Sequence, residues 1–203
     1  MEDSSRAAGL SKGTDMHVGL HVNFTQPFND TNCPLDLLRH QHRVGRFLRS
    51  SKYALLIFNP FLCQSFRRLY LAQYEEFLRL YGRPPTHIDG HQHMHLCSNM
   101  LLQHVIPAGH RVRRSFSFSS SEKSLSNRTY RRWVDRRLAQ RYQLTDYFFA
   151  LSQCLQSEKI KKVVELSESG PVELMTHPEK HAEYEFLMSD RFLTMLTPAL
   201  RRI

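Results

Sequence analysis

The sequence predicts an α/β fold, a distorted (β/α) TIM-like barrel, in one domain that covers residues 1–203. Three short segments alternate apolar and polar residues as strands do, and longer stretches with helical periodicity separate them. Strands that alternate with helices are typical of βα units and a parallel sheet. Histidines close the alternating segments, and in an α/β barrel this end of the strands is where the loops assemble a site.

The helices are indicated by apolar residues at three- and four-residue steps. Residues 35–51 and 65–82 show this pattern most clearly. The second stretch stops at Gly82, which is followed by an arginine and two prolines that cannot continue a helix. Further helices are expected over 127–141 and 152–170.

Strands are expected within residues 14–25, 86–95 and 171–180. The first segment places its apolar residues on one face, which we expect to be buried against helices: Met16, Val18, Leu20, Val22 and Phe24. The second follows the Gly-Arg-Pro-Pro stop, and the third follows Gly170, so each begins where a helix ends.

The charge is strongly basic, with a formal net charge of +9 and most of the excess arginines in 111–141. Such a patch could meet nucleic acid, a membrane surface or an anionic substrate. We favour a solvated, arginine-rich helix face, because the sequence contains no recognised nucleic-acid-binding module, and we expect no nucleic-acid partner.

Cysteine spacing and hydropathy bear on the compartment. The four cysteines form no CxxC pair, which fits a reducing cytoplasm, and no apolar run is long enough for a transmembrane segment. We therefore expect a cytoplasmic protein.

The stretch "HIDGHQHMH" places four histidines and one aspartate at every second position of residues 87–95. On an extended strand such positions lie about 6.6 Å apart, whereas metal–nitrogen bonds are about 2.0–2.1 Å long, so one ion cannot collect them all. One or two would be ligands, and the others would orient ligands, contact substrate or belong to a loop. His21 and His177 close the other two segments and could complete a site. Zinc, manganese, iron, nickel and magnesium are candidates, and the histidine content favours zinc; an adventitious histidine-rich loop is the alternative.

Three motifs carry a family resemblance: "GLHVNFT" (19–25), "GRPPTHIDGHQHMH" (82–95) and "ELMTHP" (173–178). In this order they resemble the YdjC-like carbohydrate deacetylases, a family that includes chitooligosaccharide deacetylases and relatives associated with hopanoid biosynthesis. The resemblance covers nearly the whole chain.

The resemblance implies hydrolytic removal of an N-acetyl group from an amino sugar, with an N-acetylated sugar or glycolipid as substrate and one divalent metal ion (Zn or Mg). By motif, His21 and His91 are the metal ligands. His177 is the general acid, and Asp89 acts beside it by orienting a ligand or His177 itself. Substrate contacts are expected from His93, His95 and Asn23.

The chain departs from the family pattern at its start. The family opens with a strand that ends in an Asp-Asp-Phe-Gly motif, which supplies a general base and a metal ligand, and this sequence contains no such motif. We expect the first βα unit to be missing, and therefore weak metal binding and weak or absent deacetylation. A non-catalytic carbohydrate-binding relative is the main alternative, and a basic nucleic-acid-binding protein ranks last. A homodimer is compatible with these expectations.

Overall fold

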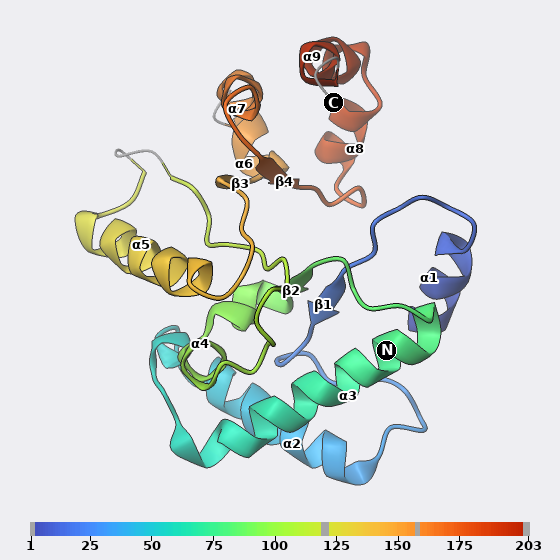
Figure 1. Ribbon diagram of the computed structural model, residues 1–203, viewed down its shortest axis with the longest axis vertical. Helices are drawn as coiled ribbons and strands as arrows, with labels where there is room; N and C mark the ends of the chain where they lie inside the picture. Colours follow the sequence, from blue (N-terminus) through green and yellow to red (C-terminus); the bar gives the residue numbers. More distant parts are fainter. Residues whose placement is uncertain (1–2, 119–121, 157–158, 201–203) are drawn as a thin grey trace. The chain divides into compact units, whose positions relative to one another are not determined.

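The computed structural model describes residues 3–118, 122–156 and 159–200, with side chains up to residue 195. The chain forms an α/β fold with two compact units (Figure 1). The first consists of Met1–Arg113 and Arg136–Gln143, and the second of Arg114–Asp135 and Leu144–Ile203. Each unit contains one parallel pair of strands.

The first unit is organised around the parallel pair β1 and β2, which lie side by side in Figure 1. Its elements are α1 (Ser4–Ser11), β1 (Leu20–Val22), α2 (Leu35–Arg49), η1 (Ala54–Leu56), η2 (Pro60–Leu62), α3 (Cys63–Tyr81), β2 (Ile88–Gly90), η3 (His91–Leu96) and α4 (Ser98–Gln103). In the strand register His21 lies opposite Asp89, and a parallel bridge joins Ile88 to Val112 on the other side of β2. The sheet therefore extends toward residues 111–113.

The two long helices of this unit confirm the predictions made from periodicity. Helix α2 lies within the expected range 35–51, and α3 closely matches 65–82. Gly82 ends α3 in the left-handed conformation (φ 65°), which glycine adopts without steric cost. The two helices lie side by side (Figure 1). They cover a core whose fully buried members include Val22, Phe24, Val44, Phe66, Leu69 and Ile88.

The strands are shorter than the alternating segments from which they were predicted. Strand β1 covers only Leu20–Val22, and the predicted apolar face is buried at Leu20, Val22 and Phe24 but not at Met16, which is 57% exposed. Strand β2 ends at Gly90. Beyond it the chain turns, because Gln92 and His93 adopt left-handed backbone angles (φ 52° and 59°) that no strand accommodates.

The second unit contains the parallel pair β3 and β4, in which Ala150 lies opposite Met175. Its elements are α5 (Leu125–Ala139, up to Asp135), β3 (Tyr147–Ala150), α6 (Leu151–Gln156), α7 (Ile160–Ser167), β4 (Val172–Met175), α8 (His181–Leu187) and α9 (Asp190–Leu200). Helix α5 and strand β4 confirm the predictions over 127–141 and 171–180.

The prediction of a single helix over 152–170 is wrong. Two helices, α6 and α7, occupy this range, and residues 157–158 between them lie outside the described residues. Both helices contribute to one core cluster, because Leu151 and Cys154 of α6 and Ile160 and Val163 of α7 turn inward and pack with Phe186 of α8.

The α/β class is confirmed, and the strand pairs are parallel as expected. Among the residues that the structure describes, each sheet has two strands and neither closes into a barrel. Closure of a TIM-like barrel therefore stays a prediction. No helix in the described part of the chain is both long and apolar enough to span a membrane.

Candidate functional site

A histidine–carboxylate–arginine chain starts from the middle residues of the short strands β1 and β2. His21 Nδ1 and Asp89 Oδ1 are 2.8 Å apart, and the other oxygen of Asp89 forms an ion pair with the Arg113 guanidinium. Because an ionised carboxylate only accepts hydrogen bonds, His21 Nδ1 is the donor. The ring is therefore held with Nδ1–H toward Asp89, and Nε2 is the ring nitrogen that Asp89 does not engage.

Asp89 is enclosed, with 9% of its side chain exposed, whereas 54% of the His21 side chain is exposed. Burial by itself raises the pKa of Asp89. The hydrogen bond from His21 and the charge of Arg113 outweigh burial and hold the pKa of this carboxyl below its ordinary value. Asp89 is thus ionised at neutral pH and remains an acceptor for His21.

His91 follows β2 directly and approaches His21. The two ring centroids are 5.8 Å apart and the rings are nearly perpendicular, at 85°. Burial and the neighbouring His21 ring lower the pKa of His91, which favours the neutral imidazole that binds metal ions. The structure therefore brings together the two histidines that were predicted as metal ligands.

His95 is buried beneath this site, with 1% of its surface exposed. Its Nε2 lies 2.9 Å from the Arg113 carbonyl oxygen, so Nε2 carries the proton and donates. Burial lowers the pKa of His95 to about 4, which keeps the ring neutral. His95 therefore supports the backbone of the residue whose guanidinium binds Asp89. Its predicted substrate contact stays a prediction, and that contact would require the ring to be uncovered.

The left-handed pair Gln92 and His93 makes this arrangement possible, because the turn folds the histidine segment back against β2. Two consecutive non-glycine residues in this region store strain of about 1–3 kcal/mol each. The Thr25 hydroxyl donates to Gln92 Oε1 at 3.0 Å and ties the turn to the loop after β1. His93 is half-buried within this turn, and its predicted contact with substrate stays a prediction.

Two glycines allow the close packing of the motif. A Cβ atom on Gly90 would lie 2.8 Å from the His95 backbone nitrogen. A Cβ atom on Gly19 would collide with the His87 ring. The Gly-Leu-His and Asp-Gly-His motifs therefore need glycine for steric reasons at these positions.

Asn23 forms the turn that follows β1. Its side-chain oxygen accepts from the backbone nitrogens of Thr25 and Gln26, and its side-chain nitrogen donates to the Gln26 carbonyl at 2.7 Å. The polar atoms of the side chain are thus engaged within the turn. Its predicted contact with substrate stays a prediction.

His177 belongs to the second unit, where it lies two residues beyond the end of β4. Its backbone N–H donates to Glu183 Oε2 at 2.6 Å, and its Nδ1 lies 3.8 Å from Glu183 Oε1. Burial raises the pKa of Glu183, but hydrogen bonds from Ser152 and His177 and the charge of Lys180 bring it below its ordinary value. Glu183 is therefore an ionised carboxylate beside the predicted general acid.

Sequence reasoning missed two residues, Arg113 and Glu183. Arg113 lies in an arginine run that was interpreted as surface charge, and its alternation with Val112 is the only signal of a strand-like position. Glu183 follows the His-Pro motif in the first turn of α8, where an acid usually favours the helix N-terminus. Neither signal is specific.

The donor set for a metal is incomplete in the described residues. No group of three His, Cys, Asp or Glu residues among them is arranged to hold an ion. His21 and His91 provide two imidazoles, and the Asp89 carboxylate is occupied by His21 and Arg113. A catalytic zinc site usually has three protein ligands, so the residues present do not form a complete site.

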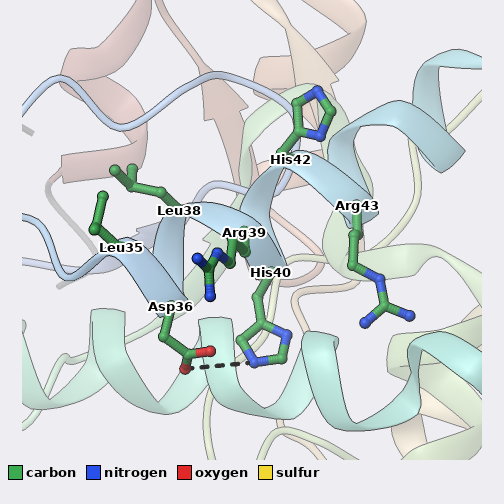
Figure 2. A pocket seen from close by; sticks show the side chains of 7 residues that line it. All are labelled: Leu35, Asp36, Leu38, Arg39, His40, His42 and Arg43. Carbon is green, nitrogen blue, oxygen red and sulfur yellow. Dashed lines mark ion pairs between the residues drawn. The ribbon is translucent and has the colours of Figure 1, made fainter.

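A separate hollow lies over α2, far from the histidine motif in sequence, and Figure 2 shows its lining. The lining comes from this helix alone: Leu35, Asp36, Leu38, Arg39, His40, His42 and Arg43. His40 pairs with Asp36 at 3.6 Å and with Ser65 Oγ at 2.9 Å, which resembles a nucleophilic triad. Ser65 is only 2% exposed, so its hydroxyl cannot meet a substrate.

The fold and the site define an α/β protein whose histidines gather at the carboxyl ends of parallel strands. The model of the YdjC-like protein family matches residues 1–197, and the chain belongs to this family. The family predicted from the three motifs is therefore confirmed.

Two relatives complete the comparison. A chitooligosaccharide deacetylase of Proteus mirabilis (strain HI4320) is 30% identical over 95 residues, which are 47% of this chain and 36% of that protein. The chain thus matches about a third of the length of this relative. A crystal structure from Enterococcus faecalis V583, of a protein named for cellobiose-phosphate cleavage, covers 97% of this chain and 78% of its own, with a TM-score of 0.56. At 14% identity this second likeness concerns the fold alone.

Proposed function

We propose that this chain is a carbohydrate deacetylase that hydrolyses the N-acetyl group of an amino sugar or a glycolipid. The observation that carries the proposal is the pairing of His21 with Asp89 and the approach of His91, at the strand ends where the family motifs lie. The chitooligosaccharide deacetylase among the relatives supports the substrate class.

His21 and His91 are proposed as two protein donors for one divalent ion, zinc or magnesium. The support is their mutual approach and the carboxylate that fixes the His21 tautomer. Among the described residues, no third protein donor completes the site. We expect weak binding of the ion and slow turnover for the same reason.

Hydrolysis of the acetamide adds water across the C–N bond and releases acetate and a free amine, and the amine leaves only if its nitrogen receives a proton. His177 is proposed as the donor of this proton, in keeping with its place in the His-Pro motif. Its Nδ1 faces Glu183, which leaves Nε2 to meet the amine. Asp89 acts by holding His21, and His93 and Asn23 are proposed to contact the sugar, as is His95 once its ring is uncovered.

Carbohydrate binding without hydrolysis is the second candidate, and the incomplete donor set favours it over a fully active enzyme. One experiment separates the two. Acetate release from an N-acetylated chitooligosaccharide is measured with added zinc, with added magnesium and with a chelator, and sugar binding is measured by calorimetry in parallel. Slow release that the chelator abolishes supports the deacetylase. Sugar binding without acetate release supports the second candidate. If the protein neither binds the sugar nor releases acetate, both candidates are refuted.

A further inference from the structure

A cluster of polar groups surrounds Glu183 in the second unit. Ser152 follows β3 and His177 follows β4, so the parallel pairing of these strands places both residues at the same edge of the sheet. Glu183 lies between them and is only 1% exposed. Its Oε1 accepts from the Ser152 hydroxyl and lies 3.5 Å from Lys180 Nζ, which in turn donates to Ser152 Oγ at 3.2 Å.

The two oxygens of Glu183 have different partners. Oε2 accepts the backbone N–H of His177 at 2.6 Å, and the Lys180 N–H donates to the His177 carbonyl at 2.9 Å, so the loop before α8 is fixed. This anchoring needs only a neutral acceptor. Oε1 instead faces the His177 ring and lies 3.8 Å from its Nδ1.

Nδ1 of His177 is enclosed and makes no hydrogen bond within the part of the chain that the structure describes. An ionised carboxylate accepts and cannot donate, so a ring nitrogen that faces it is favoured in the protonated form. A carboxylate used in this way sets both the tautomer and the orientation of an imidazole.

We propose that Glu183 is a positioning residue for His177: it holds the ring with Nδ1–H toward its carboxylate and directs Nε2 away from the enclosed side. This inference rests on the proposed function for its catalytic meaning, because Nε2 is the nitrogen that would protonate the leaving amine. Ser152 and Lys180 support Glu183 by fixing its Oε1 and compensating its charge.

The substitution Glu183→Gln tests the proposal, because glutamine keeps the shape and one acceptor for the His177 N–H but removes the charge. The tautomer of His177 is measured by ¹⁵N nuclear magnetic resonance of histidine-labelled protein, with the signal assigned from a His177→Phe variant. We expect the Nδ1–H tautomer to dominate in the wild-type neutral ring and to lose its dominance in Glu183→Gln. Glu185→Gln is the matched control, since Glu185 lies on the same helix and is exposed.

Acetate release is the second readout. We expect kcat to fall about 10–100-fold in Glu183→Gln with KM unchanged, whereas the control keeps both values. If the wild type releases no acetate, but Glu183→Gln still changes the His177 tautomer, the proposed function is refuted and the positioning role stands.

Two results would overturn the positioning role. One is an unchanged His177 tautomer in Glu183→Gln. The other is a wild-type neutral ring in which the Nε2–H tautomer dominates. This measurement needs no variant, so it tests the positioning role even if Glu183→Gln does not fold.

Discussion

The two units use a buried carboxylate beside a histidine in different ways. In the first, Asp89 bonds the His21 ring directly at 2.8 Å and is itself paired with Arg113. In the second, Glu183 bonds the backbone of His177 and leaves the ring at 3.8 Å. A direct bond fixes a ring in the way that a metal ligand requires. At 3.8 Å the charge of Glu183 orients the His177 ring without a direct hydrogen bond, which suits a group that must give up a proton.

The largest effect that this comparison predicts is on stability. Asp89→Ala removes the partner of the Arg113 ion pair in an enclosed place, where side-chain exposures are 13% and 9%, and should lower the free energy of unfolding by about 3–5 kcal/mol. Urea unfolding followed by circular dichroism measures it. Asp36→Ala is the control, because Asp36 pairs with His40 at the surface. A loss in Asp89→Ala no greater than in the control would show that the Asp89 pair is not structurally stronger than a surface pair.

Glycine substitutions compare how tightly the two units are packed. In Gly90→Ala the new Cβ meets the backbone nitrogen of His95, so we expect a loss of about 1–3 kcal/mol in the free energy of unfolding. In Gly170→Ala the Cβ meets the carboxylate end of Asp146, an exposed side chain that can swing away, and the loss should be smaller. Equal losses in the two variants would refute this difference in packing.

The pH dependence of stability should come first from His95. Burial holds its pKa at about 4 in the folded chain against 6.5 as the ordinary value, so the unfolded state binds more protons between these values. Stability is therefore full above pH 6.5 and falls as the pH drops toward 4, by at most about 2 kcal/mol between pH 7 and pH 5. The pKa of Glu183 is lowered from 4.5, so its contribution is lost only below that pH.

Urea unfolding at several pH values measures this slope. His95→Gln keeps a donor for the Arg113 carbonyl and should flatten the dependence between pH 7 and pH 5. A slope as steep in His95→Gln as in the wild type would assign the pH dependence to other groups.

The sequence allowed the prediction of α2 and α3, because amphipathic periodicity is a local signal. The family resemblance singled out His21 and His91 as a pair, and their rings approach each other in the structure. The sequence did not allow the prediction of the turn at Gln92 and His93, because alternation of residue types does not encode the sign of φ.

The partners of the Asp89 and Glu183 carboxylates could not be predicted from the sequence either. Arg113 reaches Asp89 across a parallel bridge, and Glu183 reaches Ser152 across the β3–β4 pair. Such contacts depend on which strands become neighbours, and no single sequence pattern specified that. The motifs therefore supplied the candidate site residues, while the structure supplied the neighbours that contact them.

The most direct test of the central claim, that His21 and His91 share one divalent ion, is zinc titration by calorimetry with a double-mutant cycle. His42→Ala on α2 is the control, because His42 is exposed and lies outside the motif. We predict that His21→Ala and His91→Ala each weaken zinc binding by about tenfold or more, and that the double variant is no weaker than the worse single variant. Unchanged affinity in either single variant, or losses that simply add in the double variant, would contradict a shared site.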